Sequence, residues 1–145
     1  MAAVTYESKI SSARTGAGPI YAVLSDMRSL EKVRDLIPED KVRNMEFDAD
    51  SARFKVDGFG QKITVRVVDR EPQKTIKLAT ENSPIVMTFW IQLKELSPSD
   101  TRIRLTLRTD LPLMFKMMLE KKLKDGLDQA ADMLAGLPYE AWSAV

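Results

Sequence analysis

The chain has 145 residues, and we expect residues 1–145 to form a single domain. With 44% hydrophobic and 30% charged residues, it has the composition of an ordinary globular protein. The net charge of +1 provides no bulk field that would attract nucleic acid, so we expect no nucleic-acid partner.

Cysteine and histidine are both absent from the chain. This removes disulfides, thiolate nucleophiles, the commonest general base near neutral pH and the commonest metal ligand. We therefore expect no metal site and no cofactor. The lack of cysteine, of a secretory signal and of an apolar run long enough to span a bilayer together predict a cytoplasmic location.

The first part of the chain predicts one strand followed by two short helices. Residues 4–14 alternate between two faces, which indicates a strand. The members of its inner face are Val4, Tyr6, Ser8 and Ile10. Glycine and proline break the strand at residues 16–19, and Pro19 suits the first turn of a helix. A second short helix is expected over residues 27–36.

Six further strands are expected, at spacings of about 10 residues with short turns between them. They cover residues 42–48, 52–57, 62–70, 75–80, 85–96 and 102–109. Tight turns at this spacing predict an antiparallel meander, and the alternation of apolar and polar residues predicts one buried and one solvated face.

Residues 112–137 predict one long amphipathic helix that covers the buried face of the sheet. Its apolar stripe comprises Phe115, Leu119, Leu123, Leu127, Ala130, Leu134 and Leu137. The first turns are apolar on every side, through Leu113, Met114, Met117 and Met118. Two interpretations stay open for these turns: they form a cavity mouth or contact surface, or they pack against the two short helices. Gly126 interrupts the helix, either to leave room for a ligand or, as we favour, to admit a neighbouring strand or bulky side chain.

The order of these elements, and the motif over residues 17–38, resemble a known superfamily. The motif places a proline before an aromatic residue, a hydrophobic pair and a polar cap, here Pro19, Tyr21, Val23-Leu24 and Ser25-Asp26. In both respects the chain resembles the START-like (SRPBCC) superfamily of polyketide cyclase-like, coenzyme-Q-binding-like and birch-pollen-allergen-like proteins. The resemblance implies an α+β helix-grip fold, a seven-stranded curved antiparallel sheet wrapped around a long C-terminal helix, with two short helices between the first and second strands. It also implies a cavity between sheet and helix for lipids, sterols, polyketides or quinones.

The predicted inner face carries no acid and no base, so it has poor means of moving protons. Our leading hypothesis is therefore that the protein binds a small hydrophobic ligand (lipid, quinone or polyketide-like) without catalysis. The residues expected to contact this ligand are Tyr6, Phe54, Met87, Phe89, Leu105, Leu107, Phe115, Met118, Leu119 and Leu123.

Two alternatives remain. The first is a polyketide cyclase/dehydratase-like enzyme, which requires a charged residue facing inward beside Tyr6 or Thr109. The second is a protein interaction module with a largely solid core, in which Trp90 on the outer face of the sheet forms a homodimer contact. The apolar start of the last helix would also suit transient membrane contact through the cavity mouth.

Overall fold

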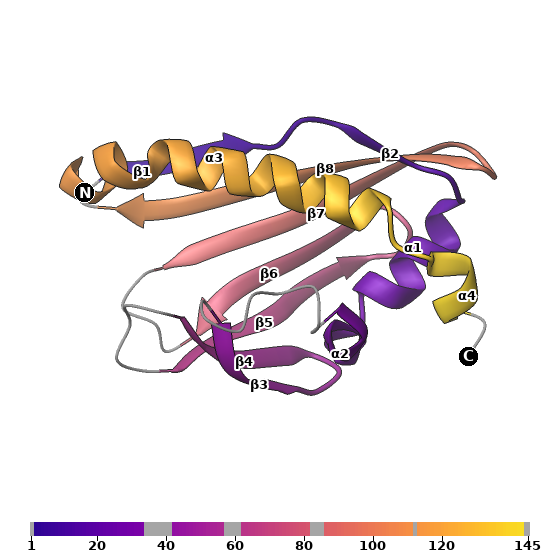
Figure 1. Cartoon of the computed structure of the whole chain (residues 1–145), viewed down its shortest axis with the longest axis horizontal. Helices are drawn as coiled ribbons and strands as arrows, with labels where there is room; N and C mark the ends of the chain where they lie inside the picture. The colour runs from indigo at the N-terminus through magenta and orange to yellow at the C-terminus, as the bar shows by residue number, and fades with distance from the viewer. Residues whose placement is uncertain (1, 34–41, 57–61, 82–85, 112, 144–145) are drawn as a thin grey trace.

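A curved antiparallel sheet forms the body of the protein in a computed structural model, which describes residues 2–33, 42–56, 62–81, 86–111 and 113–143 (Figure 1). The strands are β1 Ala2–Glu7, β2 Ser11–Ala13, β3 Val42–Phe47, β4 Ser51–Val56, β5 Lys62–Glu71, β6 Thr75–Glu81, β7 Met87–Ser97 and β8 Asp100–Leu111. Their order in the sheet is β1-β8-β7-β6-β5-β4-β3, with β2 also paired to β8. The predicted meander is confirmed, and the first predicted strand closes the sheet beside the last one.

Helices cover one face of this sheet. The helices are α1 Ala17–Leu24, the 3₁₀ helix η1 Met27–Ser29, α2 Leu30–Val33, α3 Leu113–Ala135 and α4 Tyr139–Ser143. The long helix α3 lies over β8, β1 and β2, while α1 packs against α4 beyond its C-terminal end (Figure 1). This arrangement confirms the helix-grip α+β fold. Within the described residues, no helix combines the length and apolar character that crossing a membrane requires.

The first predicted strand is divided by a β-bulge, and this corrects the predicted position of Ile10. Glu7 pairs with Thr106, whereas Ser11 pairs with Ile103, so the N-terminal segment holds one residue more than β8 over this interval. One extra residue reverses which side chains face inward. Ser11 is therefore buried, and Ile10 is 60% exposed instead of lying on the inner face.

The core lies between the inner face of the sheet and the helices. Side chains that alternate along β6, β7 and β8 are buried there, as the strand period predicts. Ile76, Ile103 and Leu105 are at most 1% exposed. Burial of each such side chain stabilises the fold by about 1.5–3 kcal/mol. From α3, Leu127 and Ala131 complete this core above β8.

Helix α4 was not expected, because Gly136 and Pro138 predict the end of the last helix. The chain instead turns at these residues and forms one further short helix. Tyr139, which is 1% exposed, donates its hydroxyl hydrogen bond to the carbonyl oxygen of Leu134 in α3. This bond, together with the packing of α4 on α1, holds the C-terminal segment against the rest of the fold.

Candidate functional site

An apolar cavity of about 460 Å³ lies between the sheet and its helical cover. Its lining residues are Val23, Leu24, Asp26, Met27, Ser29, Leu30, Phe54, Ile63, Val65, Leu78, Ala79, Thr80, Met87, Phe89, Ile91, Met133, Leu134, Leu137 and Trp142. They come from β4 to β7 on one side and from α1, η1, α2, the end of α3 and α4 on the other. A volume of this size suits one small molecule.

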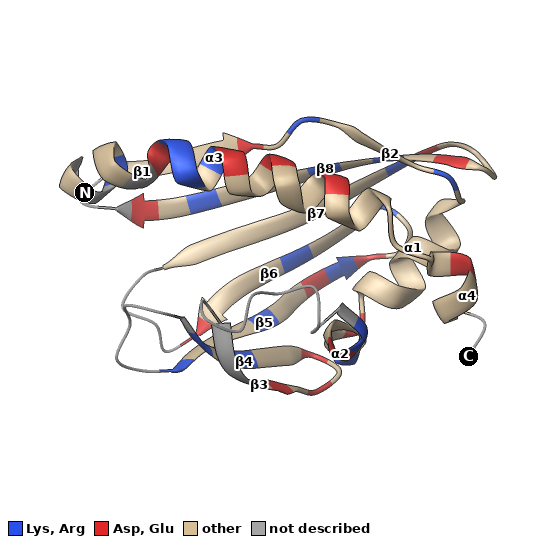
Figure 2. Cartoon of the chain, viewed as in Figure 1, with Lys and Arg blue, Asp and Glu red and all other residues tan. Residues whose placement is uncertain are grey.

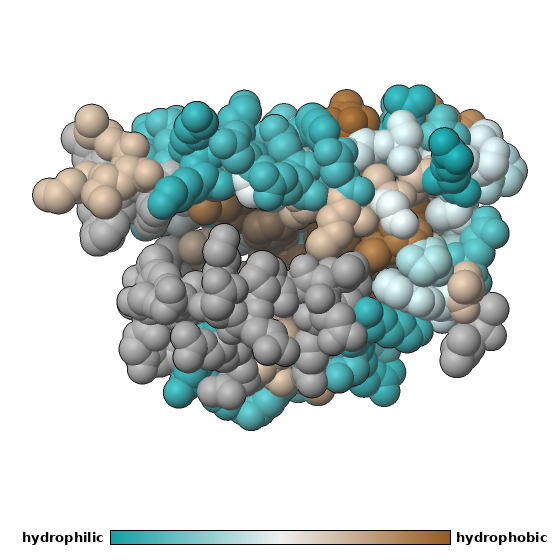
Figure 3. All heavy atoms as spheres, in the orientation of Figure 1, coloured by the Kyte–Doolittle hydropathy of each residue, from teal (hydrophilic) through white to brown (hydrophobic). Residues whose placement is uncertain are grey.

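The cavity exists because α3 covers only part of the sheet. This helix contacts β8, β1 and β2, so the inward side chains of β8 are packed against it. The inward side chains of β4 to β7 are covered instead by the shorter helices, which fill less space. Figure 3 shows the result as a brown, apolar hollow beneath the hydrophilic outer face of α3.

Two polar side chains of the cavity wall, Asp26 and Thr80, are engaged in hydrogen bonds within the protein. Asp26 accepts a hydrogen bond from the backbone N–H of Arg28, which caps η1, and pairs with the guanidinium of Arg28 at 2.6 Å. This hydrogen-bonded guanidinium lowers the pKa of Asp26, so the carboxylate is charged at neutral pH. The hydroxyl of Thr80 accepts a hydrogen bond of 2.9 Å from the N–H of Met87. Among the described lining residues, Asp26 is the only titratable group.

Trp142 of α4 lines one end of the cavity and is held by α2. The ammonium group of Lys32 lies 5.6 Å from the centre of the indole ring and donates a hydrogen bond of 3.4 Å to the Trp142 carbonyl. A cation over an indole face is attracted by the ring quadrupole. The two short helices therefore form one connected cover at this end.

The predicted ligand-contact residues fall into three groups. Phe54, Met87 and Phe89 line the cavity. Four others do not line the cavity: the hydrophobic core includes Tyr6, Leu105 and Leu107, and Leu123 packs against this core. Met118 is 67% exposed on α3, and the side chains of Phe115 and Leu119 lie outside the described part of the structure. The assignment of all ten residues to ligand binding stays a prediction.

Sequence reasoning placed the cavity under the first half of α3 and missed much of its helical wall. The missed contributors from the short helices and α4 include Met27, Leu30 and Trp142. The apolar stripe of the last helix already contained Leu134 and Leu137, which do line the cavity. No comparable signal marked Trp142, since it follows the predicted end of the last helix.

Tyr6 carries a buried hydroxyl group with an unusual environment. The residue is 7% exposed, and its hydroxyl oxygen has no hydrogen-bond partner among the described residues. Burial raises the pKa of Tyr6, and the negative charge of Glu120 on α3 raises this pKa further. The phenol is therefore neutral at physiological pH and available as a hydrogen-bond donor.

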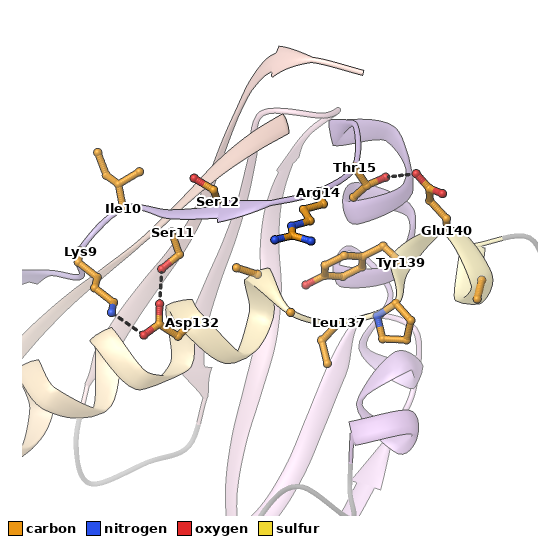
Figure 4. A pocket seen from close by; sticks show the side chains of 14 residues that line it. Lys9, Ile10, Ser11, Ser12, Arg14, Thr15, Asp132, Leu137, Tyr139 and Glu140 are labelled. Atoms are coloured by element: carbon orange, nitrogen blue, oxygen red, sulfur yellow. Dashed lines mark hydrogen bonds and ion pairs between the residues drawn. The ribbon is translucent and has the colours of Figure 1, made fainter. Parts of the chain in front are cut away.

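A second, polar groove of about 890 Å³ lies on the other side of the end of α3, between β2 and α4 (Figure 4). Three of its charged side chains, those of Lys9, Asp132 and Glu140, bind other residues of the groove. Asp132 pairs with Lys9 and accepts a hydrogen bond of 2.8 Å from the hydroxyl of Ser11. Glu140 accepts one of 3.0 Å from the hydroxyl of Thr15. Because these contacts join the N-terminal segment to α3 and α4, we interpret the groove as a structural clamp and the apolar cavity as the candidate site.

A metal site is not apparent in the described ranges. They hold no group of three or more histidine, cysteine, aspartate or glutamate side chains placed to bind an ion.

Comparison with solved structures places this architecture among known proteins. Truncated norcoclaurine synthase from Thalictrum flavum matches with a TM-score of 0.69 at 14% identity, over 93% of this chain and 92% of that chain. A structure of the same synthase in complex with dopamine and hydroxybenzaldehyde matches with a TM-score of 0.66 at 12% identity, over 86% and 79% of the two chains. A START superfamily protein from Mycobacterium smegmatis matches with a TM-score of 0.58 at 17% identity, over 83% and 88%.

No protein-family model and no curated protein sequence matches the chain. The likeness therefore concerns the fold, because identities this low do not transfer an activity. Together with the sheet order and the position of α3, the comparisons confirm the resemblance at this level: the chain has the START-like helix-grip fold.

Proposed function

We propose that this protein binds a small hydrophobic molecule of the lipid, quinone or polyketide-like class in the cavity between β4 to β7 and the helices. The observation that supports this proposal most directly is the cavity itself, about 460 Å³ of space with an almost wholly apolar wall. A cavity of this kind favours apolar ligands because their binding removes apolar surface from water. A norcoclaurine synthase structure with this fold holds two small aromatic molecules, dopamine and hydroxybenzaldehyde.

Binding without catalysis is the form of this proposal that the wall chemistry favours. General acid–base catalysis needs a titratable group that can exchange a proton with the substrate. The guanidinium of Arg28 binds both oxygens of the Asp26 carboxylate in a bidentate ion pair, which stabilises the charged form of Asp26. The polyketide cyclase-like alternative would have to use Tyr6 with Glu120, whose charge acts on the Tyr6 hydroxyl from α3.

A small aromatic ketone of suitable size, acetylnaphthalene, can test the proposal in a calorimetric titration. Val65→Phe adds an aromatic ring to the cavity wall, whereas Val68→Phe makes the same change on the same strand at a residue that is 51% exposed. We expect Val65→Phe to weaken binding at least about tenfold and Val68→Phe to leave it unchanged, because only the first removes cavity space. Equal affinity of both variants, or no binding to the wild type, would contradict the proposal. In a separate experiment, native mass spectrometry of the purified protein would identify any natural ligand that remains bound.

The start of α3 supports a second proposal, that the protein exchanges its ligand at an anionic membrane surface. Met114, Met117 and Met118 are 73%, 76% and 67% exposed, respectively. The lysines of the same half of the helix are Lys116, Lys121, Lys122 and Lys124. Figure 2 shows this basic half, with the acidic residues concentrated toward the other end. Apolar side chains next to lysines match the chemistry of an anionic bilayer surface, into which such helices insert their apolar residues.

Vesicle sedimentation can test this membrane proposal. Vesicles of phosphatidylcholine with phosphatidylserine should bind the wild type, and vesicles of phosphatidylcholine alone should bind it less. Met117→Asp should reduce binding, whereas Leu96→Asp, at an exposed apolar residue of β7, should not. Absence of vesicle binding would contradict the proposal. A concentration-dependent dimer that Met117→Asp abolishes would contradict it in favour of a second copy of the chain on this surface.

A further inference from the structure

The described wall of the apolar cavity offers no positive charge to a ligand. Neither lysine nor arginine occurs among the described residues that line it, and the single ionised group there is the carboxylate of Asp26. The guanidinium that pairs with this carboxylate belongs to Arg28, which is 68% exposed and is not part of the lining. An anion that enters the cavity would therefore meet no cationic side chain among these residues.

The lysines of the helical cover lie outside the cavity. Among the described residues of α3, Met133 and Leu134 line it, in the last turn of the helix. Lys124, the last lysine of α3, precedes Met133 by 9 residues, which is about 13 Å along the helix axis. Lys32 contacts the indole ring of Trp142 and donates to its carbonyl oxygen, and it is not part of the lining either. The positive charge of α3 thus belongs to the start of the helix and not to the cavity.

The C-terminal end of α3 adds negative potential at the cavity. The carbonyl groups at the end of a helix carry partial negative charge, which disfavours a nearby anion. The last turn of α3, which contains Met133 and Leu134, has no basic residue to offset this charge. Arg70 offsets the corresponding dipole of α1, where it donates to the Ser25 carbonyl oxygen, but it pairs with Asp50 and does not line the cavity.

We propose that the cavity takes uncharged molecules and excludes those whose buried part carries a carboxylate or phosphate, so that the ligand class narrows to quinones, ketones and neutral lipids. This inference rests on the proposed function, since it names the chemical class that the same cavity takes. An ion loses its hydration when it enters an apolar cavity, and a partner of opposite charge is needed to offset this cost. A neutral carbonyl compound loses less hydration and gains the same apolar contacts.

Three probes of nearly the same shape separate the effect of charge from that of polarity. Acetylnaphthalene carries a methyl ketone, naphthamide has an amino group in place of the methyl group, and naphthoate has a negatively charged oxygen there. Calorimetric displacement of acetylnaphthalene at neutral pH measures the affinity of the other two, so that only binding in the cavity is counted. We expect naphthamide to bind about tenfold more weakly than acetylnaphthalene, and naphthoate at least about 100-fold more weakly.

Met133→Lys supplies the missing cation. Met133 is part of the cavity wall and 37% exposed, so a lysine there can keep its ammonium group at the rim and pair with a bound carboxylate. We expect this variant to bind naphthoate about tenfold more tightly than the wild type does. Met117→Lys is the control, because it makes the same change on the same helix at a residue that is 76% exposed and outside the lining. It should leave the affinity for every probe unchanged.

The outcomes distinguish the exclusion of anions from the proposed function. If the wild type binds naphthoate as tightly as naphthamide, the exclusion is overturned while the cavity remains a binding site. Equal naphthoate affinity of Met133→Lys and Met117→Lys would also overturn it, since the charge of the wall would then not decide which ligands bind. If none of the three probes binds the wild type, the proposed function fails, and the inference fails with it.

Discussion

The carboxylate of Glu95, near the end of β7, accepts a hydrogen bond of 2.9 Å from the backbone N–H of Ala17, the first residue of α1. Gly16, at the N-cap position, has no side chain that could make this bond. A Cβ atom on Gly16 would lie 2.6 Å from Oε1 of Glu95, so the carboxylate occupies the place of a side chain. The sheet thus caps the helix that forms one wall of the cavity.

We expect Glu95→Ala to lower the free energy of unfolding by about 1 kcal/mol, the usual effect of removing an N-cap. Glu95→Gln should cost less, because its amide oxygen still accepts the bond from Ala17. Gly16→Ala should also destabilise the protein, since the new methyl group would displace the carboxylate. Urea unfolding monitored by circular dichroism measures all three. A Glu95→Ala protein as stable as the wild type would show that this cap is not needed.

Asp132 makes stability depend on pH in the acidic range. Hydrogen bonds from Lys9 and then Ser11 lower the pKa of Asp132 in the folded state. A carboxyl group with a lowered folded pKa stabilises the fold above its unfolded pKa of about 3.9, and this contribution is lost as the pH falls through the folded value. We therefore expect Asp132→Asn to destabilise the protein at neutral pH and to differ progressively less from the wild type below about pH 4.

Chemical unfolding at neutral pH and at about pH 3 checks this dependence. Asp125→Asn is the control, because it removes an exposed carboxylate from the same helix. The difference in unfolding free energy between Asp125→Asn and the wild type should not become progressively smaller at acidic pH in the way expected for Asp132→Asn. If the difference in unfolding free energy between Asp132→Asn and the wild type is the same at all pH values, the ion pair with Lys9 makes no pH-dependent contribution to stability.

Gly126 offers a stabilising substitution. The residue is exposed in the interior of α3, and a Cβ atom there would meet no described atom within 4 Å. No described atom approaches closely enough to explain the glycine, so the interpretation that it admits a neighbouring strand or bulky side chain is wrong, and the interpretation that it leaves room for a ligand stays a prediction. Gly126→Ala should raise the free energy of unfolding by about 0.5–1 kcal/mol, through helix propensity and a less flexible unfolded chain. A loss of stability in the same urea assay would contradict this.

The fold could be predicted from the sequence because alternation and turn spacing depend on local residues. The six-strand meander and the long helix follow from those patterns, and their order limits the topology. The position of Ile10 could not be predicted, since the one-residue bulge depends on how the N-terminal segment pairs with β8. Ile10 is apolar and continues the alternation of the predicted strand, but its neighbour Ser11 is the residue that faces inward.

The cavity was harder to predict than the face on which it lies. Phe89 and Leu105 are both apolar and face the same way, yet Phe89 lines empty space and Leu105 is 1% exposed in the packed core. The difference arises from the position of α3, which covers β8 and leaves β4 to β7 to shorter helices. The pattern of apolar residues in the sequence does not indicate which strands a distant helix will cover. The methionines at the start of α3 show the same limit of sequence-based prediction. The sequence was equally consistent with their packing against the short helices. This interpretation is wrong, because Met114, Met117 and Met118 are exposed.

Trp142 should control how fast a ligand leaves the cavity. It is half-buried in the wall, and Lys32 holds it from α2 through the indole ring and the backbone carbonyl. Trp142→Ala would open this end, so we expect acetylnaphthalene to dissociate about tenfold faster, in line with the loss of about 1–2 kcal/mol of apolar contact. Lys32→Ala removes only the contact that holds the ring and should accelerate release less. Stopped-flow fluorescence measures both rates, and Trp142→Phe, which keeps an aromatic cover, should stay close to the wild type. Unchanged release from Trp142→Ala would mean that ligands leave by a path that does not involve α4.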